Sequence, residues 1–155
     1  MLFHSASPER LARIADRLIA ADTATADLIS AIATEVCDGA DSAGEIFARI
    51  RKLTDAGAWT DAALALISNE LPRWKLRRLA YDEGEWHCTL SLQRDLPDWL
   101  DEPVETVHPD LSMALLKAFI EAERRDGVTL EEPRSPTGPR IRQDYRDLIC
   151  CDNFA

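Results

Sequence analysis

The first 72 residues place apolar side chains at the spacing of an α-helix in four successive stretches. The first stretch follows Ser7 and Pro8, which suit an N-cap and a first helical turn. Its apolar residues recur every three or four positions, at Leu11, Ile14, Ala15, Leu18 and Ile19. The next three stretches begin after threonine or serine residues and end near a glycine or a proline. Connections this short predict four helices that pack as an antiparallel bundle.

From Arg73 onward the spacing changes to the alternation of a β-strand. Two runs, Trp74 to Ala80 and Trp86 to Leu92, flank Asp82-Glu83-Gly84. This pattern predicts a hairpin with a three-residue loop and Gly84 in the left-handed conformation. Such a loop pairs Tyr81 with Glu85, Ala80 with Trp86, Arg78 with Cys88, Leu76 with Leu90, and Trp74 with Leu92. One face is then apolar with Arg78 as its only charge, whereas a two-residue loop shifts the pairing and mixes polar with apolar residues.

A hairpin alone is marginally stable in water, so its apolar face needs a cover. A helix that begins at Pro109 or Asp110 and ends at Gly127 offers one, because its apolar residues form a stripe. The stripe consists of Leu111, Ala114, Leu115, Ala118, Phe119 and Ala122. The segment from Val104 to Val107 is β-branched enough for a third strand, and the prolines on either side of it indicate a sheet edge.

Together these elements predict an α+β fold. In it, an N-terminal bundle of about four helices packs on a small antiparallel sheet that the C-terminal helix covers. We expect a single domain over residues 1–127, with a helical part at 7–72 and a hairpin–helix part at 73–127. Beyond it, Pro133, Pro136, Gly138 and Pro139 indicate a Pro-rich, partly disordered tail over residues 128–155.

Charge and composition narrow the classes of function. The chain has 155 residues and a net charge of −10, which repels nucleic acids and anionic membranes, so neither is expected as a partner. The basic residues Arg49, Arg51 and Lys52 of the third helix do not outweigh that charge. The start lacks the basic and apolar regions of a secretory signal, and the four cysteines show no CxxC spacing. We therefore expect a cytoplasmic protein with free thiols.

Part of the chain resembles a group of small uncharacterised proteins of alphaproteobacteria. The residues that carry the resemblance are Trp59 to Leu64, Trp74 to Leu79, Gly84 to Cys88, the helix over 111–122, and the ending Cys150 to Ala155. The resemblance covers about half the chain and implies no known activity. The tryptophan-bearing hairpin followed by an alanine-rich helix is also similar to phage-derived α–β–α sandwich domains, and it transfers no functional residue.

Five residues are of the types that bind zinc: His87, Cys88, His108, Cys150 and Cys151. Strand alternation points His87 and Cys88 to opposite faces, and the adjacent Cys150 and Cys151 are poorly spaced for a tetrahedral site. A zinc-binding protein is therefore one alternative, and no cofactor is expected.

A small cysteine-dependent enzyme is a second alternative. The predicted register sets Arg78 opposite Cys88, and a positive charge can activate a thiol. Cys88 would nevertheless lie on the buried face, where apolar surroundings raise the pKa of a thiol. The chain also lacks the sequence signatures of a nucleophile elbow, a P-loop and a dinucleotide site. The sequence thus argues against an enzyme.

Aromatic and basic residues favour a protein–protein surface. Four tryptophans, at positions 59, 74, 86 and 99, fall within one stretch of an otherwise acidic chain, and tryptophan and arginine are typical of interface hot spots. Trp99 lies in a loop without a place in the predicted core. We predict a non-enzymatic interaction or regulatory protein, with a protein partner or as a homodimer. Its surface is expected to include Trp99, Arg77, Arg78, Tyr145 and Phe154.

Overall fold

The computed structural model describes residues 6–37, 43–92 and 102–129 of the chain. It contains the helices α1 (Pro8–Ala20), α2 (Ala26–Val36), α3 (Ala43–Asp55) and α4 (Trp59–Glu70). Three strands follow, β1 (Lys75–Asp82), β2 (Glu85–Ser91) and β3 (Val104–His108), and then α5 (Leu111–Thr129). The predicted α+β fold, with four helices before an antiparallel sheet and one helix after it, is confirmed over the described residues.

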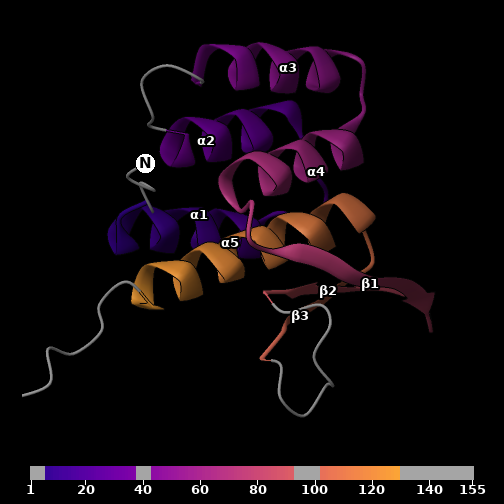
Figure 1. Cartoon of the computed structure of the whole chain (residues 1–155). Helices are drawn as coiled ribbons and strands as arrows, with labels where there is room; N and C mark the ends of the chain where they lie inside the picture. The colour runs from indigo at the N-terminus through magenta and orange to yellow at the C-terminus, as the bar shows by residue number, and fades with distance from the viewer. Residues whose placement is uncertain (1–5, 38–42, 93–101, 130–155) are drawn as a thin grey trace, which may run out of the picture.

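Helix α5 forms a layer between the N-terminal helices and the sheet (Figure 1). It packs on α1 and α4 on one side and on β2 and β3 on the other, while α3 contacts only α2 and α4 among the described elements. Its middle is therefore buried on both of these sides: Met113, Leu115, Leu116 and Phe119 have no exposed surface. The predicted stripe accounts for only one of these two buried sides. The helix also continues to Thr129, past its predicted end at Gly127.

Local signals explain how several helices begin. Thr25 caps α2 as its side chain accepts a hydrogen bond from the Leu28 N–H at 3.2 Å. Asp110 does the same for α5, since its Oδ1 accepts from the Met113 N–H at 2.9 Å. Ser7 occupies the predicted N-cap position of α1, but its side chain forms no capping hydrogen bond.

The hairpin register differs from the prediction. The loop has two residues, Glu83 and Gly84, with φ angles of 49° and 92°. Both values are positive, as a type I′ turn requires. Directly paired residues are Asp82 with Glu85, Tyr81 with Trp86, Leu79 with Cys88, and Arg78 with Thr89, whereas the pairing of Leu76 with Leu90 agrees with the prediction.

A β-bulge reconciles the short loop with an apolar inner face. The register shifts between Leu76 and Arg78, so Arg77 is the extra residue of β1. Leu76 and Leu79 are three positions apart, a spacing that plain alternation cannot place on one face. With Arg77 inserted, both leucines pack against the hydrophobic core. The expected third strand is confirmed as β3, which pairs with β2 and completes the order β1-β2-β3.

Candidate interaction surface

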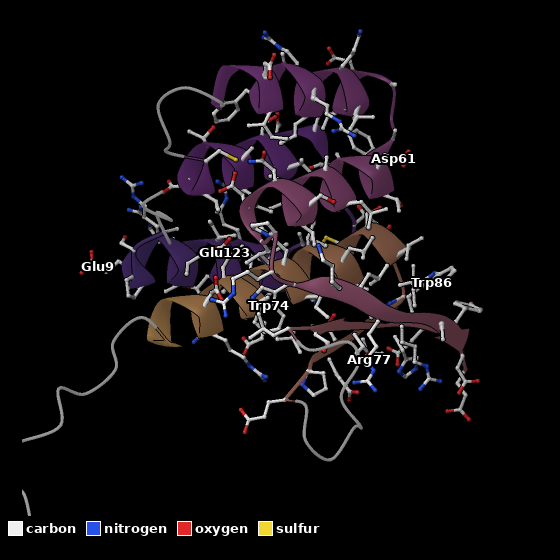
Figure 2. The ribbon with its side chains drawn as sticks, in the orientation of Figure 1. Glu9, Asp61, Trp74, Arg77, Trp86 and Glu123 are labelled. Carbon is white, nitrogen blue, oxygen red and sulfur yellow. The ribbon has the colours of Figure 1, made fainter. Side chains whose placement is uncertain are left out.

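Strand β1 is the least covered element of the sheet. Among the described elements it contacts only β2, and no helix brings a Cα atom within 8 Å of it. Helices lie on one side of the sheet, and Figure 2 shows Arg77 on the opposite side. In the central strand β2 both Thr89 and Ser91 are buried, although they lie on the outer face. The exposed side chains of the sheet therefore lie on β1, at the tip of the hairpin, and on β3 at Glu105 and Val107, and only β1 has no helix packed on it among the described elements.

An arginine-lined pocket lies on the outer face. Arg77, Arg78, Thr89, Pro103, Glu105 and Arg125 line it. Arg78, Thr89 and Glu105 form one cross-strand row through the paired strands. The Arg125 guanidinium reaches this place from α5, where its Nη1 donates to the carbonyl oxygens of Glu102 and Pro103, each at 3.1 Å. Arg125 thus holds the start of β3 next to Arg77 and Arg78, the two arginines that the sequence predicts for the interaction surface.

Charge divides β1 and its turn into two ends. Lys75, Arg77 and Arg78 lie in the first half of the strand, and Asp82 and Glu83 lie at the tip. Arg78 and Asp82 are both exposed and share the outer face, because they are four positions apart on the strand without a bulge between them. One short edge therefore presents a positive end and a negative end.

The hairpin tip also exposes an aromatic ring. Tyr81 is 61% exposed although it belongs to the inner-face row. Its ring makes a tilted contact with that of Trp86, with a centroid separation of 5.1 Å and an interplanar angle of 51°. Trp86 is partly buried and also packs against the core, on the helix side of the sheet (Figure 2). Tyr81 is thus an exposed aromatic side chain at the β1 edge, with Trp86 beside it.

The other tryptophans serve the core where the structure describes them. Trp74 is 3% exposed, and its Nε1 donates to Asp126 Oδ1 at 3.2 Å. Trp59 is partly buried and packs against the core. Trp99, Tyr145 and Phe154, which the sequence predicts for the interaction surface, lie outside the described residues.

The zinc candidates do not come together within the described part of the chain. His87 lies on the outer face and Cys88 on the inner face, as expected from alternation. His108 Nδ1 accepts the Asp110 backbone N–H at 3.0 Å, so this nitrogen is already used in a local turn. Cys150 and Cys151 lie outside the described residues. Within residues 6–37, 43–92 and 102–129 no group of three or more His, Cys, Asp or Glu side chains could hold a metal ion.

The predicted pairing of Arg78 with Cys88 is wrong. The two-residue loop sets Leu79 opposite Cys88 and turns Arg78 to the other face, beside Thr89. Burial raises the pKa of Cys88 to about 11, against a smaller lowering by a hydrogen bond with Thr106. The thiol is 1% exposed, so the arrangement opposes rather than promotes formation of a nucleophilic thiolate.

Sequence reasoning missed a buried glutamate of α5, Glu123, which lies near two partly buried carboxylates. Glu123 is 3% exposed, and burial, with the nearby carboxylates of Glu70 and Asp126, raises its pKa to about 8 (Figure 2). Burial and a hydrogen bond with Glu70 also raise the pKa of the Cys37 thiol. No described cation forms an ion pair with Glu123. A glutamate flanked by Ala122 and exposed arginines gives no local signal that it will face the interior.

Comparison with protein-family models, with curated protein sequences and with solved structures gives no match. None of the helices that the structure describes is long and apolar enough to span a bilayer.

Proposed function

We propose that this chain is a non-enzymatic protein-interaction or regulatory protein whose binding surface is the β1 edge of the sheet. The observation that carries the proposal is the position of β1, which has β2 as its only described neighbour. An edge strand presents unpaired backbone N–H and C=O groups and can accept a further strand from another chain. Proteins generally protect such an edge, so an unprotected edge strand indicates a binding site for a strand of another chain.

The distribution of protective features supports the same surface. Lys75 and the bulge at Arg77 occupy the start of β1, and both are devices that discourage strand addition. From Arg78 to Asp82 the pairing with β2 is regular and no proline intervenes. This five-residue segment, which we call the open edge (residues 78–82), also carries the exposed Tyr81. Tyrosine and arginine are side chains that contribute strongly to interfaces.

The test compares two charge reversals in the intact, tagged chain. Arg78→Glu changes the open edge, whereas Arg17→Glu makes the same change on the exposed side of α1, away from the sheet. We expect wild type and Arg17→Glu to retain the same bound protein, whether another protein or a second copy, in affinity capture and native mass spectrometry. We expect Arg78→Glu to lose it. Equal retention by both variants would exclude the open edge as the binding surface.

A further inference from the structure

We infer that the occupant of the open edge is a second copy of this chain. Two β1 strands would pair antiparallel about a two-fold axis at Ala80 and join two three-stranded sheets into one continuous sheet. This inference rests on the proposed function and specifies its partner. Backbone geometry, charge and the exposed aromatic ring each support it.

The backbone of the open edge is suited to this pairing. In a two-residue hairpin the residues that flank the turn, Asp82 and Glu85, form a hydrogen-bonded pair, and the pairs then alternate. Tyr81 and Leu79 belong to the non-hydrogen-bonded pairs, so their N–H and C=O groups point away from β2. An axis at Ala80 sets Leu79 of each copy opposite Tyr81 of the other. The outward N–H and C=O groups of the two strands can then form hydrogen bonds with each other.

Charge selects this register among its neighbours. With the axis at Ala80, Arg78 of each copy lies opposite Asp82 of the other, and the pair occurs twice by symmetry. Moving the axis to Arg78 places the two Arg78 side chains opposite each other. Moving it to Leu79 or Tyr81 leaves Arg78 and Asp82 without an opposite charge directly across. Since opposite charges across a strand pair stabilise and like charges destabilise it, the axis at Ala80 is favoured.

The same register covers the exposed aromatic ring. Tyr81, 61% exposed in one copy, would pack beside Leu79 of the other on the inner face. An aromatic side chain next to an aliphatic one is a favourable cross-strand pair. The positive and negative ends of one strand thus complement an antiparallel copy of themselves, which a partner of uniform charge could match at only one end.

The bulge limits the length of the pairing. Arg77 interrupts the regular ladder, so about five residues of each copy take part. An interface of this length falls below the usual size of stable complexes. We therefore expect a reversible dimer whose population rises with protein concentration, with a dissociation constant of roughly micromolar order or weaker.

A charge-swap cycle on the intact chain tests the inference by sedimentation equilibrium over a range of protein concentrations. In a dimer of Arg78→Asp, both pairs of positions 78 and 82 place an acid opposite an acid. In a dimer of Asp82→Arg, both pairs place an arginine opposite an arginine. Each single variant should therefore weaken dimerisation about tenfold or more. The double variant Arg78→Asp/Asp82→Arg restores opposite charges and should return to within about threefold of wild type. Arg17→Asp serves as the control for net charge, and thermal unfolding checks that every variant is folded.

A mixture of the two single variants gives the sharpest readout. Arg78→Asp carries two acids and Asp82→Arg carries two arginines on the open edge, so the mixed dimer regains both opposite-charge pairs. We expect it to form more tightly than either variant with itself. A wild type that is monomeric at every concentration would overturn the inference, as would a dimer indifferent to both single changes. If monomeric wild type still captures a different protein through Arg78, the proposed function stands and the second copy is excluded.

Discussion

At the scale of single residues, the buried Glu123 makes the stability of the protein depend on pH. Its carboxyl is buried beside Glu70 and Asp126, and its pKa rises from 4.5 to about 8. In the unfolded chain the same group ionises near its ordinary value. The folded state therefore holds a proton that the unfolded state releases between pH 4.5 and about 8. The stabilisation is complete below the lower pKa and is lost as pH rises through the upper one.

This shift predicts the behaviour of Glu123→Gln. The free energy of unfolding of wild type should fall by roughly 3–5 kcal/mol relative to this variant between pH 5 and pH 8.5, because the amide cannot ionise. Urea denaturation across that range measures the difference. Asp16→Asn, at an exposed position of α1, is the control and should follow wild type. Parallel curves for wild type and Glu123→Gln would show that Glu123 is ionised in the folded protein.

The buried cysteines give a second prediction. Cys37 and Cys88 are 5% and 1% exposed, and burial raises the pKa of both thiols. Iodoacetamide reacts with exposed thiolates, so neither cysteine should be alkylated in the folded protein at neutral pH. Both should react fully in denaturant, and peptide mass spectrometry distinguishes the sites. Rapid alkylation of Cys88 under native conditions would revive the cysteine-enzyme alternative.

At the scale of the elements, the turn after β1 depends on a glycine. Gly84 has φ of 92°, where an L-residue with a side chain is strained, although a Cβ atom at this position would have no neighbouring atom within 4 Å. Gly84→Ala should therefore destabilise the protein by about 1–2 kcal/mol. Gly44→Ala is the matched control, because Gly44 lies in α3 with open space around it. There alanine favours the helix, and we expect stabilisation of about 0.5–1 kcal/mol by urea denaturation.

The elements differ in how far the sequence determines them. Helices α1 to α4 follow from local apolar spacing, because this spacing alone indicates which side of a helix is buried. The polar start is right for α2, whereas α4 begins after Ala58 and not after the expected threonine. The hairpin is predicted in the right place but in the wrong register, since plain alternation allows for no bulge. The three-residue spacing of Leu76 and Leu79 is the signal that indicates one. Apolar residues on more than one side of α5, such as Met113 and Leu116, likewise indicate two buried sides.

Only part of the candidate surface can be predicted from the sequence. Arg77 and Arg78 stand out by local composition, and the structure places both at one pocket. Arg125 joins them from 47 positions beyond Arg78 through bonds to backbone carbonyls, which no sequence pattern encodes. The importance of Tyr81 and Asp82 likewise emerges only when the register and the neighbours of β1 are known. Edge position is a property of the assembled sheet.

At the scale of the whole molecule, the layered arrangement explains why none of the described helices packs on β1. Among the described elements, helix α5 packs on β2 and β3 and contacts α1 and α4, whereas β1 contributes Leu76 and Leu79 to the core without a helix packed on it. An uncovered strand is therefore compatible with a stable monomer. Dimerisation through this edge would add a strand pair without rearranging the core, which is why it can be weak and reversible.

A disulfide placed on the proposed axis tests the assembly directly. Ala80 of the two copies would form a non-hydrogen-bonded pair with Cα atoms about 4.5 Å apart, within the range of a disulfide. In a background with Cys150 and Cys151 replaced by serine, Ala80→Cys should cross-link into a covalent dimer under mild oxidation. Arg78→Cys is the control, because four strand positions would separate its two copies by roughly 13 Å, too far for a bond. Efficient cross-linking at position 78 and none at position 80, measured by non-reducing electrophoresis, would contradict the register. The reverse pattern would place the two-fold axis at Ala80.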